Sequence, residues 1–480
     1  MTLDGAGSSW SSSGVLTLGY YGNGTLSISN GGAANVAGGT GTTVLANYSG
    51  SSGTLDIGAG GAAGILNAAA VYGGAGTATL NFNHSDSAYH FTRDGSASGT
   101  AIAIHGSTSV NHVGSGTTIL TGNSSYSGTT TVDRGMLAIR SGGAVSDTEG
   151  YIGRNAGGSG TVTVDGAGSR WSNSGSLYVG DSGSGMLAIG NGGAVSVAGG
   201  TGTVTLANYS GSSGTLDIGA GGAAGILNAA AVYGGAGTAT LNFNHSDSAY
   251  HFTRDGSASG TAIAIHGSMS VNHIGSGATV LAGAHTYSGD TNINGGTLIV
   301  NGSIAGATFV NSGGTLGGSG TLGDVTVKSG GTLSPGNSPG ILSVNGVMEI
   351  DGPTPGTGYD QINVSGSATL DGTLDLRFGA MPTGGSRYRL INAGSLLLAG
   401  DPQTGFNPIT ENLSSNLGSA MRMMPVVDAG SFDILIQQLS FIGASGGNLA
   451  SNQRSVAANL DSFSTSGRGA ALFGELNLLS

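Results

Sequence analysis

The sequence predicts an all-β fold that winds as a β-solenoid and ends in a β cap followed by a short helix. Three observations predict this fold: a long unit is repeated almost entire, a short strand-and-corner template recurs inside it, and the spacing between templates leaves no room for helices. Residues 4–128 recur as residues 165–289 at a constant offset of 161, and residues 45–107 return unchanged as residues 206–268. Repetition of this kind is typical of proteins in which each structural unit stacks on the next.

The inner template, Gly-x-Leu-x-Ile-x-x-Gly-Gly, predicts one short strand followed by a corner. Leu and Ile two positions apart place both side chains on one face of a strand and the residue between them on the other. The glycine pair can adopt positive φ angles and therefore turns the chain. The template starts at Gly24, Gly53, Gly135, Gly185 and Gly214, with looser relatives at Gly296, Gly314 and Gly331.

The spacing of the templates distinguishes a solenoid from the alternatives. The last three starts are 18 and 17 residues apart, which is too short for a βαβ crossover with its helix but suits one coil of a solenoid. Disorder is the other alternative, because 97 of the 480 residues are glycine. A flexible glycine-rich linker, however, has no reason to repeat Leu and Ile two positions apart.

Composition excludes several function classes. Charged residues make up 8% of the chain, Lys328 is the only lysine, and the formal net charge is -12. Because nucleic-acid binding requires clustered Lys and Arg, we expect no nucleic-acid partner. Cysteine is absent, so disulfides and thiolate metal sites are excluded. No apolar run of 18 residues and no signal-peptide pattern after Met1 is present, and we expect any export signal to lie outside these residues.

Repeats and composition divide the chain into four predicted segments. Six of the eight prolines fall in the third segment, where the strands lengthen, and the fourth contains Leu449, Val456, Leu460 and Phe463 at spacings that predict a short helix. The segments are residues 1–164 (a first unit that begins partway through the repeat), 165–344 (a second unit with terminal coils), 345–440 (the β cap) and 441–480 (a linker).

Several segments resemble one known family. The stretches 120–132 and 281–293, each with Tyr-Ser-Gly and each followed by Gly-x-Leu, resemble the passenger-associated β-strand repeat of Gram-negative autotransporters. Gly331-Thr-Leu-Ser-Pro-Gly-Asn-Ser-Pro-Gly340, with Tyr359-Asp-Gln361 and Tyr388-x-Leu-Ile391 after it, is similar to the junction and autochaperone region of that family. The block Phe82-Asn-His-Ser-Asp86 is similar to its self-associating adhesin branch.

The resemblance implies a right-handed parallel β-helix that is exported through the periplasm and displayed at the outer membrane and cell surface of a Gram-negative bacterium, or released from it. Residues 1–344 would then be β-helix, residues 345–440 an autochaperone-like cap, and residues 441–480 a linker. The passenger's own C-terminal outer-membrane barrel would be a partner, and we expect the sequence to stop just before it.

One duplicated polar cluster could hold a metal ion. His84, Asp86, His90 and Asp94 return as His245, Asp247, His251 and Asp255. His84 and Asp86 share a strand face, and a site completed by His90 across a turn is conceivable. The alternative is a solvated loop that was duplicated together with the unit around it. We favour the loop and expect no metal.

Other motifs match functional patterns without their structural context. Gly336-Asn-Ser338-Pro-Gly340 and Gly443-Ala-Ser445-Gly-Gly447 match the nucleophile elbow, which requires a strand before the serine and a helix directly after it. Gly318-Ser-Gly320-Thr-Leu-Gly323 matches a dinucleotide fingerprint but runs into a predicted strand, and Leu322 stands where a calcium-binding repeat has Asp. Trp10 and Trp171 occupy equivalent positions, where packing on a coil edge is more ordinary than ligand binding.

The sequence therefore predicts a non-enzymatic protein without catalytic residues, cofactors or a small-molecule substrate. The four glutamates are widely separated in the sequence, so the sequence does not indicate a catalytic carboxylate pair or a catalytic triad. We expect a surface-displayed adhesin or self-association scaffold whose partners are host or bacterial surface molecules, or identical passengers on neighbouring cells. The alternative is a stalk for an enzymatic domain upstream of these residues.

Overall fold

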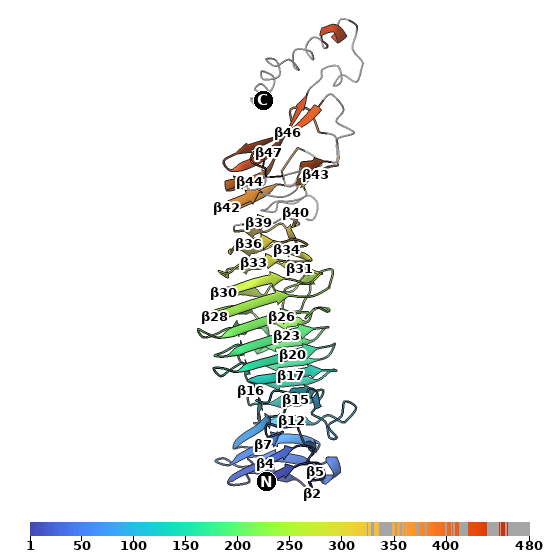
Figure 1. The fold of residues 1–480 in the computed structure, drawn as a ribbon, viewed down its shortest axis with the longest axis vertical. Helices are drawn as coiled ribbons and strands as arrows, with labels where there is room; N and C mark the ends of the chain where they lie inside the picture. The colour runs from blue at the N-terminus through green and yellow to red at the C-terminus, as the bar shows by residue number, and fades with distance from the viewer. Residues whose placement is uncertain are drawn as a thin grey trace. The chain divides into compact units, whose positions relative to one another are not determined.

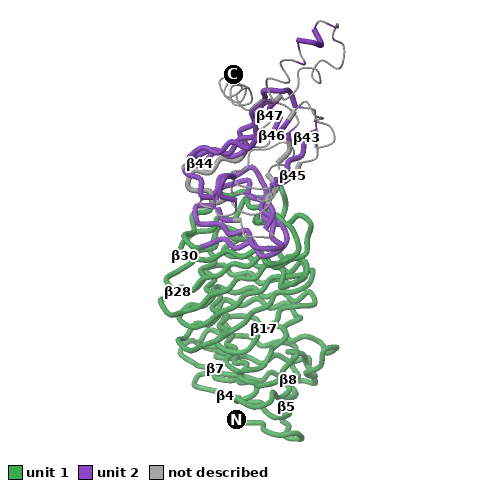
Figure 2. Tube along the Cα trace, turned by 45° about the horizontal axis from the view of Figure 1, so that its top comes forward, with its two compact units in different colours: residues 1–289 green, residues 290–480 purple. Residues whose placement is uncertain are grey.

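The structure, a computed structural model, divides into two compact units, Met1–Gly289 and Asp290–Ser480 (Figure 2). It describes residues 1–323 without interruption. Beyond them it describes residues 325–327, 331–335, 348–350, 353–355, 358–359, 361–370, 374–379, 382–398, 401–404, 406, 409–411, 421–438, 451, 453–456 and 458.

The first unit is a parallel β-helix with three strands in each coil (Figure 1). The first coil consists of β1 (Thr2–Asp4), β2 (Ser9–Ser12) and β3 (Leu16–Leu18). In the second coil, β4 (Asn23–Ser29), β5 (Ala33–Val36) and β6 (Thr42–Leu45) pair in parallel with the same three strands in turn. The predicted all-β solenoid is thus confirmed.

Stacking of the coils produces three ladders of parallel strands, called A, B and C here, which the chain visits in that order in every coil. Ladder A runs β1–β4–β7–β10–β13–β16–β19–β22–β25 and then through the first halves of β28 and β30. Ladder B consists of two separately paired stretches, first β2–β5–β8 and then β11–β14–β17–β20–β23–β26 with the second halves of β28 and β30. Ladder C runs β3–β6–β9–β12–β15–β18–β21–β24–β27.

The bounds of the other strands in this unit are β7 (Ser52–Ile57), β8 (Ile65–Asn67), β9 (Ala70–Gly73), β10 (Thr77–Phe82), β11 (Tyr89–His90), β12 (Ala103–Gly106), β13 (Ser109–His112), β14 (Thr117–Leu120), β15 (Asn123–Tyr126), β16 (Thr130–Val132), β17 (Arg134–Arg140), β18 (Ala144–Asp147), β19 (Gly150–Ile152), β20 (Ser159–Asp165), β21 (Arg170–Asn173), β22 (Leu177–Val179), β23 (Ser184–Gly190), β24 (Ala194–Val197), β25 (Thr203–Leu206), β26 (Ser213–Ile218), β27 (Ile226–Asn228), β28 (Ala231–Phe243), β29 (Tyr250–His251), β30 (Ala264–His273), β31 (Ala278–Leu281) and β32 (Ala284–His285).

The core of this unit is a set of side-chain columns that run from coil to coil. Leu26 pairs in register with Leu55, and Leu55 with Leu80, and all three are fully buried. Burying each such side chain stabilises the fold by about 1.5–3 kcal/mol. After β4 the chain turns at Gly31, whose φ of 80° confirms the predicted glycine corner. The template therefore specifies both the inward columns and the corners between strands.

The second unit continues with short parallel strands and then changes direction. β33 (Thr291–Ile293), β36 (Thr308–Val310), β39 (Val325–Val327), β42 (Ile362–Leu370) and β44 (Arg387–Leu398) pair in parallel. β44 then pairs antiparallel with β47 (Ser431–Gln438), which forms a hairpin with β46 (Met421–Asp428). The remaining strands are β34 (Thr297–Val300), β35 (Ser303–Ile304), β37 (Thr315–Gly318), β38 (Thr321–Leu322), β40 (Thr332–Pro335), β41 (Met348–Ile350), β43 (Leu374–Phe378) and β45 (Ile409–Glu411).

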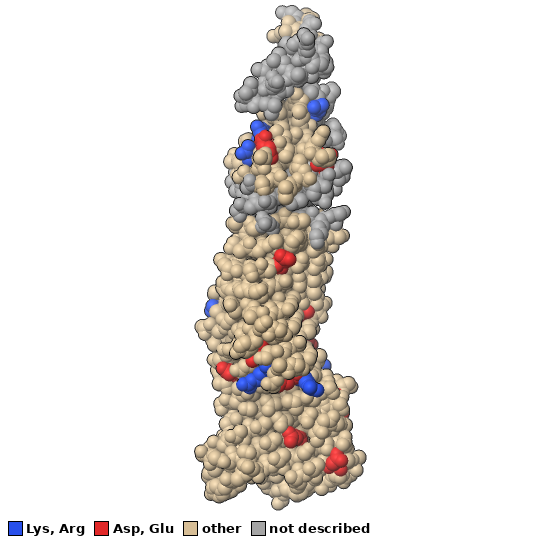
Figure 3. All heavy atoms as spheres, turned by 60° about the vertical axis from the view of Figure 1, so that its left-hand side comes forward, with Lys and Arg blue, Asp and Glu red and all other residues tan. Residues whose placement is uncertain are grey.

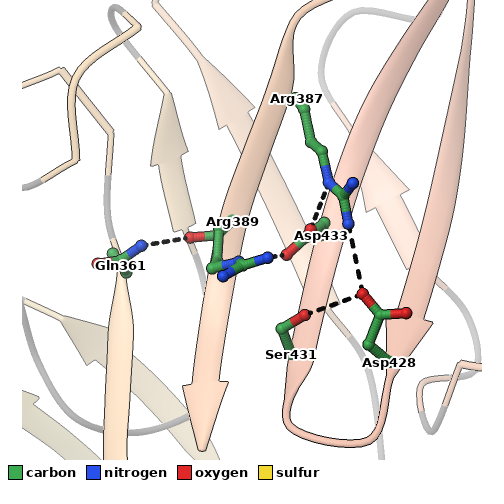
Figure 4. Close-up of polar contacts among 6 residues, drawn as sticks. All are labelled: Gln361, Arg387, Arg389, Asp428, Ser431 and Asp433. Carbon is green, nitrogen blue, oxygen red and sulfur yellow. Dashed lines mark hydrogen bonds and ion pairs between the residues drawn. The ribbon is translucent and has the colours of Figure 1, made fainter. Parts of the chain in front are cut away.

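A buried carboxylate ties this hairpin to the last parallel strand (Figure 4). Asp433 on β47 is fully buried and accepts hydrogen bonds from Arg387 Nε at 2.5 Å and from Arg389 Nε at 3.3 Å. The second guanidinium nitrogen of Arg387 reaches Asp428 at 3.4 Å, and Gln361 Nε2 donates to the carbonyl of Arg389 at 3.0 Å. Charge-assisted contacts of this kind are stronger than neutral ones, so they fix the position of β47 on β44.

The predicted boundaries at residues 164, 344 and 440 stay predictions. The two compact units are defined by contacts between residues, whereas the predicted boundaries were defined by the sequence repeat and by composition. Residues 451, 453–456 and 458 are helical, within the predicted linker helix, whereas Phe463 lies outside the described residues. Among the described residues, no helix is both long and apolar enough to cross a membrane.

We expect the Asp433→Ala substitution to lower the free energy of unfolding of the hairpin by about 3 kcal/mol, because it leaves two guanidinium groups without their shared carboxylate. The matched control is Asp375→Ala, which removes the exposed Arg377–Asp375 pair and should cost less than about 1 kcal/mol. Hydrogen exchange in β44 and β47 measures both losses. Equal losses would contradict the role given to Asp433.

Candidate interaction surface

The outer faces of the coils carry polar side chains that bond from one coil to the next. On ladder A, Asn81 Nδ2 donates to Asp56 Oδ1 at 2.5 Å, and Asn111 Nδ2 donates to Asn81 Oδ1 at 3.0 Å. The second copy repeats the contact, with Asn272 Nδ2 donating to Asn242 Oδ1 at 3.0 Å. Hydroxyl and amide groups both donate and accept, so they can bond each other and an outside partner.

Charge is scarce on this surface. On the face that Figure 3 shows, most of the surface of the first unit is uncharged. One band on this face combines basic and acidic residues, and smaller charged patches lie apart from it. Three of the arginines, Arg134, Arg140 and Arg154, belong to the segment 129–164 that joins the two copies, and Arg170 lies near the start of the second copy. Arg140 pairs in register with Asp165, and Arg154 lies 4.3 Å from the ring centre of Tyr151. The band therefore mixes both signs and has no basic patch.

The duplicated histidine cluster is divided between the core and the surface. His84 is fully buried, its Nε2 lies 2.7 Å from Thr118 Oγ1, and its Nδ1 lies 3.3 Å from Asp86 Oδ2. Asp94 instead holds a separate turn, where it accepts bonds from the Ser96 amide at 3.0 Å and the Ser96 hydroxyl at 2.9 Å. Within the described residues, no three His, Asp or Glu side chains come together as a possible metal site.

The preferred interpretation of this tract as a solvated loop is wrong at its centre. Tyr89 and Phe91 are buried together with His84, and the Phe91 ring packs edge-on against Phe82 with centroids 5.1 Å apart. The reason is that β11 enters ladder B and pairs with β14, which carries the aromatic rings into the coil. The second copy has the same arrangement, with His245 Nε2 2.7 Å from Thr279 Oγ1, His245 Nδ1 3.4 Å from Asp247, and Asp255 holding the Ser257 turn; His251 lies on β29.

Burial keeps the histidines of this core neutral. Desolvation lowers the pKa of His84, with Asp86 opposing it, and lowers the pKa of His112 to about 4. His112 Nδ1 lies 2.8 Å from the carbonyl oxygen of Arg134, which requires that this nitrogen carry the proton. The two rings lie 5.6 Å apart, so protonating one would also disfavour protonating the other.

The two tryptophans differ although their positions are equivalent. Trp171 is fully buried and its Nε1 donates to Asp147 Oδ2 at 2.9 Å, which confirms packing as its role, whereas Trp10 is half-buried. Asp147 also accepts bonds from Thr130 Oγ1 and Asn173 Nδ2. Desolvation nevertheless raises the pKa of Asp147 to about 6.

Exposed tyrosines provide the aromatic part of the surface. Tyr72, 47% exposed, lines a groove of about 800 Å³ that crosses successive strands of ladder C. The other lining residues are mainly small or hydroxyl-bearing: Asn47, Gly73, Gly74, Ala75, Gly106, Ser107, Ser125, Tyr126, Ser127, Ser146, Asp147, Thr148 and Ser174. Sequence reasoning missed this groove, although the alternation in Val71-Tyr72-Gly73 indicates an outward Tyr72.

A second aromatic group consists of Tyr20, Tyr21 and Tyr48. The rings of Tyr21 and Tyr48 are stacked with centroids 4.6 Å apart, and Tyr20 packs edge-on against both. Tyr21 is 73% exposed. In the second copy, Asp181 and Ser182 replace the first two tyrosines and leave Tyr209 as the counterpart of Tyr48. The aromatic group therefore belongs to one copy alone.

The enzyme-like motifs receive no support where the structure describes them. Gly318 ends β37 with a φ of 109° and β38 follows, so a strand stands where the dinucleotide fingerprint requires a helix. The motifs at 336–340 and 443–447 lie outside the described residues.

Comparison with known families identifies the chain. Residues 113–139 and 274–300 each match the passenger-associated-transport-repeat, at equivalent positions in the two copies. The chain is an autotransporter passenger. The first match covers β14, β15, β16 and most of β17, so the repeat corresponds to about one coil of the passenger. No curated protein matches the sequence. Passengers of this kind are exported to the outer membrane and cell surface of Gram-negative bacteria with a C-terminal translocator as partner.

The buried histidine predicts an acid-sensitive passenger. The pKa of His112 is about 4 in the folded state, below the ordinary value near 6.5, so its contribution is complete above about pH 6.5 and is lost as the pH falls toward 4. We expect about 2–3 kcal/mol of unfolding free energy to be lost between pH 7 and 4.5, and a smaller loss in His112→Gln. Denaturant unfolding at the two pH values measures the difference. An identical loss in both proteins would exclude His112 as a source.

Asp147 predicts that stability depends on pH in the opposite direction. Its folded pKa of about 6 lies above the ordinary value near 3.9, so its stabilising contribution is complete below about pH 4 and is lost as the pH rises through 6. Between pH 4 and 6 this group alone should lower the free energy of unfolding by about 2 kcal/mol, and Asp147→Asn should abolish that slope. Melting temperatures across this range test the expectation, with His112→Gln as the control of opposite sign. A slope that Asp147→Asn leaves unchanged would contradict it.

Proposed function

We propose that this passenger is a non-enzymatic adhesive scaffold that binds surface molecules of host or bacterial cells, or identical passengers on neighbouring cells. The observation that carries the proposal is the outer surface of the first unit, which combines hydroxyl and amide ladders, exposed tyrosines and few charges. Tyrosine contributes a large, fairly rigid contact area together with a polar tip, and is enriched in binding hot spots. A sparsely charged surface also approaches a similar surface with little electrostatic repulsion.

The carboxylates with raised pKa values support the non-enzymatic part of the proposal. Asp147 is surrounded by three donors that hold it in the packing around Trp171. Burial also raises the pKa of Asp217, which accepts bonds from the Ala220 amide at 3.1 Å and from Asn244 Nδ2 at 3.4 Å. Glycosidase chemistry requires two carboxyl groups at a defined separation, and these two lie on different strands, β18 and β26, each within its own hydrogen bonds.

The test is to display the passenger on a bacterial host that neither aggregates nor adheres. Cells with the passenger should settle faster from suspension, or adhere more strongly to host cells, than cells that display an unrelated β-helix at equal surface density. Because few charges face outward, raising the salt concentration to about 0.5 M should change the settling rate by less than twofold. Cells that display the passenger but neither settle nor adhere would contradict adhesion and favour a stalk role.

A further inference from the structure

The two copies of the repeat do not present their surfaces on the same side of the β-helix. Thr163–Asp165, the copy of β1, lies in β20, the nineteenth strand after β1. Since a coil contains three strands, the copy begins six coils and one strand later. Every residue of the second copy therefore stands one ladder further on than its equivalent in the first.

Strand pairing shows this shift directly. The template strand β4 pairs with β1 and β7 on ladder A, whereas its copy β23 pairs with β20 and β26 on ladder B. In the same way β3 pairs with β6 on ladder C, and its equivalent β22 pairs with β19 and β25 on ladder A. A repeat of complete coils would have kept each copy in its own ladder.

Tyr72 and Tyr233 show what the shift does to an exposed residue. Both belong to the 63-residue block that is identical in the two copies, and they are 47% and 46% exposed. Each pairs on one side with an identical neighbour, Tyr72 with His105 and Tyr233 with His266. Tyr72 lies on ladder C, whereas Tyr233 pairs with Thr205 on ladder A. The same exposed tyrosine–histidine pair thus occurs on two sides of the β-helix.

The distance between the two surfaces follows from the coil repeat. Strands that pair within a ladder are about 4.8 Å apart, so six and one-third coils separate the tyrosines by roughly 30 Å along the axis. A straight partner that runs along ladder C would cover the face of Tyr72 but not that of Tyr233. The two tyrosines therefore face in different directions.

We propose that the passenger is divalent, with the Tyr72 face and the Tyr233 face each binding another copy of this chain. The inference rests on the proposed adhesive function and adds its valence and geometry. The surroundings of Tyr72 suit a second copy because Asn47, Ser107, Ser125 and Ser127 carry groups that both donate and accept hydrogen bonds. We take each face to bind the same face of another copy, so a contact at one face alone closes as a dimer. Two such faces that point in different directions extend the assembly beyond the dimer.

The test compares the purified full chain with Tyr72→Ser, Tyr233→Ser and the double variant by sedimentation velocity over a range of concentrations. The wild type should form species larger than dimers, each single variant should stop at dimers, and the double variant should stay monomeric. Each substitution should weaken its own face at least tenfold. Val113→Ser changes an exposed apolar residue at a different corner, after β13, and should assemble like the wild type. Unchanged melting temperatures would show that the variants fold.

The outcomes separate the inference from the function on which it rests. If the wild type associates and only one of the two tyrosine variants associates less, divalency through these faces is wrong and self-association stands. The same conclusion follows if both variants associate like the wild type. If the wild type stays monomeric and displayed cells fail to settle or adhere, the proposed function fails with it. A monomeric chain that binds dextran-coated beads through two sites, one lost in each single variant, would assign a glycan to these faces and overturn self-association.

Discussion

Register between coils is the constraint on which the rest of the structure depends. A single coil of three short strands cannot bury its apolar side chains or pair its backbone, and both needs are met by the coils on either side. Leu26, Leu55 and Leu80 line up because the strands that carry them pair without a shift, and the same register brings Asn81 beside Asp56 on the outside. A one-residue slip would exchange the two sets of side chains, so the core and the outer surface specify each other.

The sequence predicts the parts of this fold that depend on local spacing. Leu and Ile two positions apart and the glycines after them were sufficient to place β4 and β7, because alternation within a strand and positive φ at a corner are properties of a few neighbouring residues. The ladder to which a strand belongs was not predictable in the same way. It depends on counting every strand, including β3 and β22, which have three residues each and no template.

Burial of the histidine tract could not be predicted from the sequence either. His84 and Asp86 are polar residues, yet the short strand β11 carries Tyr89, and Phe91 directly after it, into the coil. The buried ring of His84 contacts Thr118, 34 residues away. The contact between Tyr20 and Tyr48 is similar, since 28 residues separate them and the length of one coil brings them together. In both cases a contact between coils, which no short sequence window contains, determines the environment of the side chain.

The hairpin of β46 and β47 has a consequence for the length of the molecule. A parallel strand with one free edge exposes N–H and C=O groups that can template another strand, from the same chain or from a foreign one. β44 has such an edge, and β47 pairs with it in the antiparallel direction. The hydrogen bond between Arg387 of β44 and Asp433 of β47 stabilises this pairing. Coil addition cannot continue past a strand that runs the opposite way, so the hairpin acts as a stop signal for growth of the stack.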